Sequence, residues 1–122
     1  MAQFYEMTAA ALREEIRKGH IGVEELTRAY LDRIDKYDQS CGLNSVAVIN
    51  DSVIEDARKL DERQANRDLP LFGLPVLVKD NIDVAGLYTT AGSLALTDNA
   101  AIADAPVIRN LRRNGALILG KT

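Results

Sequence analysis

Apolar residues recur every three or four positions through the first third of the chain, the spacing of one buried helix face. A first helix is predicted from Thr8, its N-cap, to about Lys18, where Gly19 follows as a stop. A second helix is predicted over residues 23–37. Its periodic apolar positions are Val23, Leu26, Tyr30, Ile34 and Tyr37. The chain is therefore expected to open with two amphipathic helices.

Short β-branched or apolar runs alternate with helical patterns in the rest of the chain. Strands are predicted at SVAVIN (45–50), PVLVK (75–79) and ALIL (116–119). Between them the pattern predicts a helix over 52–66, capped by Asp51, and a second one between Asp104 and Gly115. Residues 80–92 are expected to be irregular, with one helical turn at 93–96.

This order of elements is typical of an α/β fold. Two N-terminal helices are followed by alternating strands and helices, which predicts part of a mixed, largely parallel sheet covered by helices. Three strands cannot supply cover on both faces and a neighbour at each edge, so the sheet is expected to be incomplete. We expect one incomplete domain over 1–122, with a helical lead-in (1–44) and a strand–helix core (45–122).

Composition and charge exclude several classes of protein. The 122 residues are 47% hydrophobic and 27% charged, as in ordinary globular proteins. The net charge of -3 argues against a nucleic-acid-binding surface, which needs a basic patch. No apolar run is long enough to span a bilayer, and residues 1–8 lack the features of a secretory signal. The expected location is the cytoplasm, with no membrane and no nucleic-acid partner.

Lys79 is the most unusual candidate for chemistry, because it ends an apolar run. One interpretation is a lysine that reaches solvent or pairs with Asp80 or Asp83. The other is an amine held in apolar surroundings, where desolvation disfavours the ammonium form and makes the lysine a base near neutral pH. The pattern alone favours the first interpretation. Asp80 and Asp83 are expected to orient the backbone and Lys79 rather than to bind a cation.

The last eight residues, GALILGKT (115–122), match the phosphate-binding expression G-x-x-x-x-G-K-[ST]. That motif needs a loose loop whose backbone N–H groups turn toward phosphates ahead of a helix. Here the four intervening residues are themselves the predicted strand, so we reject the motif and expect a strand that leaves a helix end. No His, Cys and carboxylate cluster has metal-ligand spacing, so no metal is expected.

The block GLPVLVKDNID (73–83) resembles the amidase signature family, whose segment around its catalytic lysine usually reads G-[IVL]-P-x-x-[IVL]-K-D-N. The likeness continues through TTAGS (89–93) and through 104–122, and upstream through 25–37 and 43–47. It therefore covers nearly the whole chain in the right order and spacing. The resemblance reverses the preference for a merely solvent-reaching Lys79.

The resemblance implies a Ser–cis-Ser–Lys triad that hydrolyses carboxamides, with Lys79 as its lysine. In such a site the lysine keeps a bridging serine basic, and that serine takes the proton from the nucleophilic serine as it attacks the amide carbon. Ammonia or an amine leaves, and water hydrolyses the acyl-enzyme. The candidate supporting residues around Lys79 are Asp80, Asn81, Thr90 and Ser93. Neither a metal nor an organic cofactor is implied.

The sequence departs from the family in one decisive respect. The Gly- and Ser-rich stretch that holds both catalytic serines has no counterpart here, and Ser40, Ser45, Ser52 and Ser93 do not stand in such a setting. We therefore expect the N-terminal segment of an amidase, inactive alone because two of three catalytic residues are absent. A small carboxamide would be its substrate only with the missing portion. Exposed sheet surface is expected to promote self-association or pairing with a complementing chain.

Two alternatives stay open at this point. One is a non-catalytic binding or scaffold module that reuses the front half of an amidase. The other is part of the glutamyl-tRNA amidotransferase A subunit, which shares the Lys-Asp-Asn block. The A subunit often has Cys-Ala-Ser where this chain has Ala91, Gly92 and Ser93, which favours a general amidase. The acyl group and the leaving amine are set by regions that the sequence does not contain.

Overall fold

The structure, a computed structural model, describes residues 4–122, so the first three residues of the N-terminal stretch discussed above lie outside it. Within 4–122 the helices are α1 (Ala9–Lys18), α2 (Val23–Ile34), α3 (Val53–Glu62) and α4 (Pro106–Arg113). The strands are β1 (Val48–Ile49), β2 (Pro75–Val78) and β3 (Leu117–Lys121). Short 3-10 turns cover Phe4–Glu6, Gln64–Asn66 and Leu94–Leu96. The predicted α/β class is confirmed.

The first two helices are found where the sequence predicts them. Thr8 caps α1, its Oγ1 accepting a hydrogen bond from the Ala11 N–H at 3.1 Å, and Gly19 ends the helix in the left-handed region at φ 77°. The α-helical part of α2 ends at Ile34, before the predicted end at residue 37. The chain then continues as a π-helical turn, Asp35–Gln39.

The third helix differs from the prediction at both ends. The N-cap of α3 is Ser52 rather than Asp51, and the side chain of Asn50 accepts hydrogen bonds from the Ser52 N–H and hydroxyl at 3.2 and 3.0 Å. The helix ends at Glu62, and a separate 3-10 turn covers the rest of the predicted range 52–66. The competing acceptor on Asn50 therefore moves the helix start by one residue.

The sheet has three strands in the order β1-β3-β2 within the described residues. β2 pairs with β3 in parallel, whereas β1 pairs with β3 in antiparallel fashion. The mixed sheet is thus confirmed, with β3 as its central strand. β1 is much shorter than the predicted strand 45–50. It lies close to β3 because Gly120 has no side chain, and a Cβ there would come within 2.2 Å of the Val48 carbonyl oxygen.

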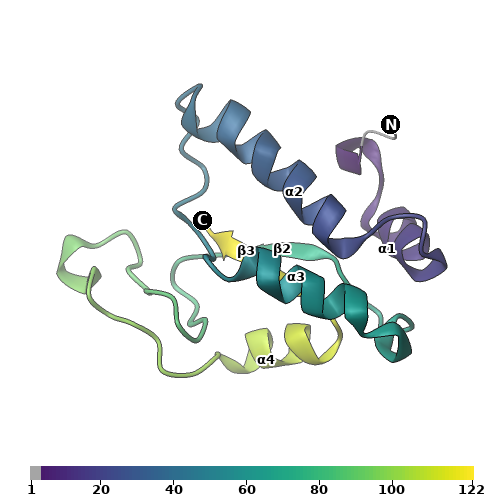
Figure 1. The fold of residues 1–122 in the computed structure, drawn as a ribbon. Coiled ribbons are helices and arrows are strands. Elements are labelled where there is room, and N and C mark those ends of the chain that lie inside the picture. The colour runs from purple at the N-terminus through teal and green to yellow at the C-terminus, as the bar shows by residue number, and fades with distance from the viewer. Residues whose placement is uncertain (1–3) are drawn as a thin grey trace.

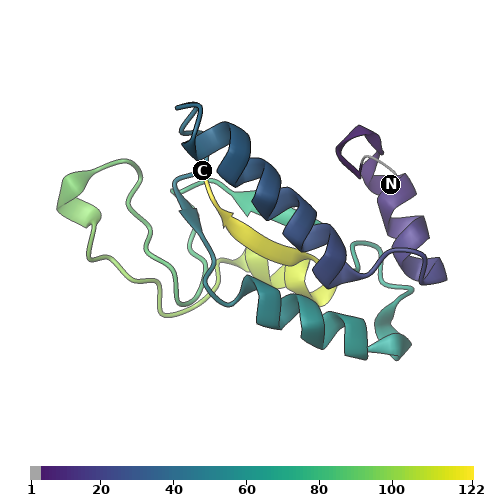
Figure 2. The ribbon, with the colours of Figure 1, turned by 45° about the horizontal axis from the view of Figure 1, so that its top comes forward.

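Two apolar clusters lie on opposite faces of the sheet. The larger one packs α1, α2 and α3 against Leu117 and Leu119 of β3. The smaller one packs Ile108 of α4 against Val78 and Ile118. Figures 1 and 2 show α2 and α4 on opposite sides of β3, and in both views the green segment between β2 and α4 extends away from the helices. The alternation of side chains along β3 therefore builds both clusters.

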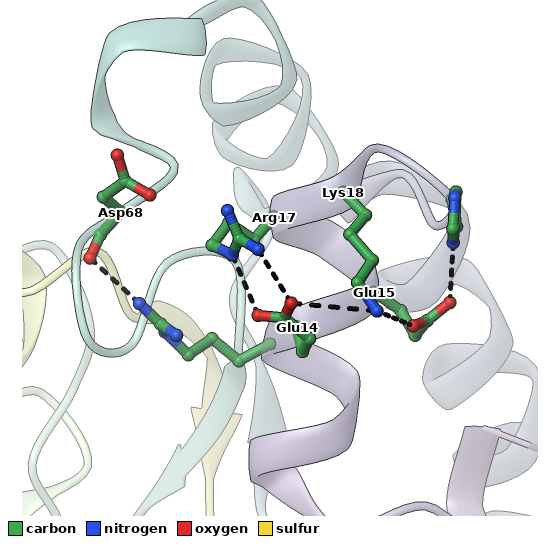
Figure 3. A network of polar contacts seen from close by, with 7 residues as sticks. Glu14, Glu15, Arg17, Lys18 and Asp68 are labelled. Atoms are coloured by element: carbon green, nitrogen blue, oxygen red, sulfur yellow. Dashed lines mark hydrogen bonds and ion pairs between the residues drawn. The ribbon is translucent and has the colours of Figure 1, made fainter.

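Charged side chains cover the outer surface of α1. The guanidinium of Arg17 donates two hydrogen bonds of 2.8 Å to the carboxylate of Glu14, and Lys18 lies within 4 Å of both Glu14 and Glu15 (Figure 3). Arg13 donates to the Asp68 carbonyl at 3.0 Å, which ties α1 to the segment ahead of β2. The hydrogen bond from Arg17 lowers the pKa of Glu14 to about 2. These exposed ion pairs make the outer surface of α1 polar and contribute little to stability.

Candidate active site

Lys79 directly follows β2, and its backbone is held from both sides by the end of the chain. The Thr122 N–H donates to the Val78 carbonyl and the Asp80 N–H donates to the Thr122 carbonyl, both at 2.9 Å. The Lys79 side chain lines an open hollow of about 290 Å³. The residues lining this hollow, hereafter the Lys79 hollow, are Ala47, Lys79, Asp80, Asn81, Ala91, Gly92 and Thr122.

The expected burial of Lys79 is wrong for the described residues. The Lys79 side chain is exposed, and Leu77, two positions earlier on the same face, is 38% exposed. The physical reason is that β2 is an edge strand, with β3 as its single neighbour. Leu77 and Lys79 belong to neither of the two apolar clusters, so the helices that cover the sheet do not extend over these two side chains at the end of β2. The amine is therefore solvated, although it does lie at a hollow.

Asp80 points away from Lys79 and joins two other segments. Its carboxylate accepts hydrogen bonds from the Thr90 N–H at 3.3 Å, from the Thr90 hydroxyl and from the ammonium group of Lys121 at 3.2 Å. Its backbone carbonyl accepts from the Ala91 N–H at 2.9 Å. The ion pair of Asp80 is thus with Lys121, which corrects the expectation that its side chain orients Lys79.

The environment of Asp80 keeps its carboxyl group ionised. Burial by itself would raise the pKa of Asp80, since it penalises the charged form. The hydrogen bonds from the Thr90 hydroxyl and N–H, together with the Lys121 ammonium group, outweigh that effect. The pKa of Asp80 therefore lies below its ordinary value.

Lys121 is a fully buried lysine, and the sequence analysis missed it. Its side chain donates to the Tyr88 carbonyl at 2.9 Å and to the Thr89 hydroxyl at 3.0 Å, besides Asp80. In the sequence it entered only as part of the rejected phosphate motif and of the family likeness over 104–122, without a role of its own. The signal that could have found it is a lysine that directly continues an apolar strand, because a buried ammonium group needs partners.

A shift in the pairing of β2 and β3 explains the direction of the Lys121 side chain. Val76 pairs with Ile118, but the next residue, Leu77, pairs with Gly120, so Leu119 is skipped. Strict alternation would place Lys121 with Leu119, on the face covered by α1–α3. After the shift Lys121 pairs with Val78, and its side chain reaches the 80–90 segment instead.

The other candidate residues are only partly brought together. Asn81 lines the Lys79 hollow beside Lys79, and Thr90 is linked to that hollow through Asp80. Ser93 instead caps the turn Leu94–Leu96, its Oγ accepting from the Ala95 N–H at 3.3 Å, and it does not line the hollow. The same holds for the other serines of the sequence, which are Ser40, Ser45 and Ser52.

The arrangement offers one amine beside an amide in an open hollow, so it can give or accept a proton but does not supply a nucleophilic serine. Among residues 4–122, no group of three or more His, Cys, Asp or Glu side chains is placed to hold a metal ion. None of the helices in that range is long and apolar enough to cross a membrane. The described residues thus form an open hollow rather than an enclosed cavity.

Comparison with known proteins gives a consistent result. The family model described as Amidase matches residues 25–122. The A subunit of the glutamyl-tRNA(Gln) amidotransferase from Protochlamydia amoebophila is 38% identical over 120 residues, which are 97% of this chain and 24% of that protein. Among solved structures, the peptide amidase of Stenotrophomonas maltophilia superposes with a TM-score of 0.89 at 38% identity. The superposition covers 96% of this chain and 24% of that peptide amidase.

A further structure is described as an amidase family protein from Bacillus anthracis str. Ames, and it superposes with a TM-score of 0.88 at 42% identity. The superposition covers 94% of this chain and 23% of that protein. The chain thus spans about a quarter of the length of the relatives that it matches. The family match includes every residue that lines the Lys79 hollow. The chain therefore belongs to the amidase family, that of the amidase signature enzymes.

Proposed function

We propose that this chain is the lysine-bearing N-terminal segment of an amidase that hydrolyses small carboxamides to a carboxylic acid and ammonia or an amine. The observation that carries the proposal is the position of Lys79. Its amine lines a hollow built from the segments that match the family, and its backbone is fixed on both sides by Thr122. A rigid backbone at this position favours a precisely placed amine.

In the proposed mechanism Lys79 acts as the base of a Ser–cis-Ser–Lys triad. The lysine keeps the bridging serine able to accept a proton, and that serine deprotonates the nucleophilic serine as it attacks the amide carbon. The leaving nitrogen takes up a proton, the acyl-enzyme forms, and water releases the acid. Both serines would come from a Gly- and Ser-rich segment that is not in this sequence. That segment would cover the Lys79 hollow and withdraw the amine from solvent.

Residues 1–122 alone are proposed to be a single incomplete domain without amidase activity. None of the sequence's serines lines the Lys79 hollow, so no serine of these residues is placed to be activated by that amine. Asp80, Asn81 and Thr90 would maintain the shape of the hollow. We propose no contact between them and the substrate carbonyl. Removal of one member of a catalytic triad typically abolishes most of the rate enhancement.

The second candidate is a glutamyl-tRNA(Gln) amidotransferase A subunit, and the similarity to such a protein over 97% of the chain favours it. In that case the protein would act within a complex and transfer an amide group to glutamyl-tRNA(Gln). The two candidates are distinguished by incubating the longer protein, alone and together with the other subunits of such a complex, with glutamyl-tRNA(Gln) and an amide donor. Hydrolysis of a simple peptide amide without the tRNA indicates a general amidase. Amide transfer that depends on the tRNA indicates the amidotransferase.

A non-catalytic binding module is the remaining alternative. It is tested by the nucleotide sequence downstream of the codon for Thr122. An in-frame continuation into a Gly- and Ser-rich segment supports the enzyme. A native stop codon followed by unrelated sequence supports the module.

The proposal predicts that Lys79→Met abolishes amide hydrolysis in the protein that also carries the serine segment. Methionine keeps the bulk of the side chain and removes the base, so kcat/KM should fall by roughly 10³ or more. The matched control is Lys59→Met, which removes an exposed lysine of α3 that lies 3.7 Å from the carboxylate of Glu55. Its rate should equal that of the wild type. A Lys79→Met protein as active as the control would contradict the catalytic role.

A further inference from the structure

The proposed mechanism assigns no role to the buried ammonium group of Lys121, the charged residue of β3. Its three acceptors come from the two ends of the 80–92 segment, since Asp80 directly follows Lys79 while Tyr88 and Thr89 lie near the other end. The side chain is fully buried, and that of Asp80 is 14% exposed. A buried charge of this kind persists only when its partners are held in place.

One of these acceptors, Asp80, lines the Lys79 hollow, and the other two directly precede the part of the chain that forms another of its walls. Asp80 is the neighbour of Lys79 in sequence, and its carboxylate also holds the Thr90 N–H and hydroxyl. Its carbonyl accepts from the Ala91 N–H, and Ala91 and Gly92 line the hollow with Lys79. Lys121 therefore lies behind the hollow and connects the strand end that carries Lys79 with the segment that forms another wall.

The pairing shift between β2 and β3 is what makes this connection possible. It turns Lys121 onto the face of Val78, while Lys79, one residue later, projects from the opposite face. The two lysines thus act from opposite sides of one strand end. The Lys121 side chain does not line the hollow, so it is not placed to touch a substrate.

We infer that Lys121 is a positioning residue for Lys79, because its buried ammonium group ties the Lys79–Asp80 strand end to the Tyr88–Gly92 segment. The inference rests on the proposed function. Lys121 is not placed to exchange a proton with substrate and acts only through Asp80 and the 88–92 segment. Loss of this tie would let the Lys79 amine shift relative to the serines, and displacements of about 1 Å can cost a hundredfold in rate.

The test uses the longer protein that carries the serine segment, assayed on a simple peptide amide. Lys121→Met removes the ammonium group and keeps the stem. Thr89→Val removes one of its acceptors and preserves the shape of the side chain. The control is Asp61→Asn, which weakens the hydrogen bonds to the Val23 and Glu24 N–H groups, far from the hollow. For each variant kcat and KM are measured separately, and the folded fraction is measured by circular dichroism.

We expect kcat of Lys121→Met to fall about a hundredfold with KM within about twofold of the wild type, because substrate binding does not involve this side chain. Thr89→Val should lower kcat by a smaller factor in the same direction. Asp61→Asn should change neither constant once corrected for the folded fraction. The effects of Lys121→Met and Asp80→Asn should be less than additive, as they interrupt the same contact.

Three outcomes would overturn the inference. Wild-type kcat in Lys121→Met and Thr89→Val, with Lys79→Met inactive, removes the positioning role and leaves the proposed function intact. A loss of activity that only follows the folded fraction, as in the control, makes Lys121 purely structural. If Lys121→Met does not fold, Thr89→Val alone decides by its kcat. An active Lys79→Met protein refutes the proposed function, and the inference with it.

Discussion

Two lysines that end neighbouring strands have opposite environments. Lys79 follows the edge strand β2 and is exposed, whereas Lys121 ends the central strand β3 and is fully buried. A strand residue is buried when other elements lie over its face and beside its edges. β3 has a neighbouring strand on both sides, whereas β2 has one. The Lys121 side chain donates hydrogen bonds to Asp80, Tyr88 and Thr89, so each of its three buried N–H groups has an acceptor.

At this scale the structure predicts an acid-sensitive contribution of Asp80 to stability. The pKa of Asp80 is lowered in the folded protein, so its contribution is fully present above the unfolded pKa, about 3.9, and is lost as the pH falls through the folded pKa. The free energy of unfolding of the wild type should exceed that of Asp80→Asn by a constant amount above about pH 5. The difference should shrink below about pH 4.

Urea unfolding at a series of pH values measures this difference. Thr90→Val is the informative companion variant, because the Thr90 hydroxyl bond is the first of the interactions that lower the pKa of Asp80. Its pH dependence in acid should be weaker than that of the wild type. A difference between the wild type and Asp80→Asn that stays constant down to about pH 2 would contradict this account.

The sequence was sufficient to single out Lys79 but not to describe its surroundings. The apolar run before it and the Lys-Asp-Asn block are local features, so they can be recognised in one dimension. The exposure of Lys79 depends on the position of β2 at the edge of the sheet, where no strand of the described residues lies on its outer side. The role of Lys121 depends on a pairing shift at Leu119, which no local pattern encodes. Thr90 was named from resemblance, and its contact with Asp80 supplies a physical reason.

Elements in this fold are delimited as much by distant side chains as by their own residues. The N-terminus of α2 is the clearest example. Its cap, Gly22, has no side chain, and the Val23 and Glu24 N–H groups donate to the Asp61 carboxylate of α3 at 2.7 and 2.9 Å. A carboxylate at this position also meets the positive end of the helix dipole. Asp61 thus joins two of the helices that build the larger core.

Asp61→Ala is therefore expected to destabilise the protein by about 1–2 kcal/mol, the usual cost of a lost N-cap with charged acceptors. Guanidinium unfolding of the wild type and the variant gives this difference. The control is Glu55→Ala on the same helix, whose exposed contact with Lys59 should contribute much less. Equal stabilities of the two variants would refute the capping role.

The sequence predicts best those elements whose ends are fixed by their own residues. α1 carries its own cap and its own stop, Thr8 and Gly19, and was predicted within a residue. β1 was predicted too long because the run 45–50 is β-branched, while only Val48–Ile49 pair with β3. The N-cap of α3 moved to Ser52 because the Asn50 side chain, itself held by the Ile118 carbonyl, accepts its N–H. Contacts between elements therefore decide the ends that local patterns leave undetermined.

The molecule as a whole is well packed on one side and uncovered on another. Three helices close one face of the sheet, and α4 covers part of the other. The segment between β2 and α4 extends from this body (Figures 1 and 2). It carries apolar side chains that are almost entirely exposed, namely Leu94 at 90% and Ile102 at 99%. Leu77 on β2 and Val107 on α4 add to this exposed apolar surface.

The polypeptide of residues 1–122 is accordingly predicted to self-associate. An edge strand with unpaired backbone groups and a set of exposed apolar side chains both favour association. Sedimentation velocity over a range of micromolar concentrations measures the size distribution. Leu94→Ser and Ile102→Ser together should shift it toward the monomer. A monodisperse wild-type monomer throughout this range would contradict the prediction.

The most direct test of the central claim is a crystal structure of the longer protein that includes the serine segment. The account predicts that the Lys79 amine is covered and lies within hydrogen-bond distance, about 2.7–3.2 Å, of a serine hydroxyl. Lys121 should keep its contact with Asp80 behind it. A Lys79 amine that still points into bulk solvent, with no serine hydroxyl in reach, would contradict the catalytic assignment.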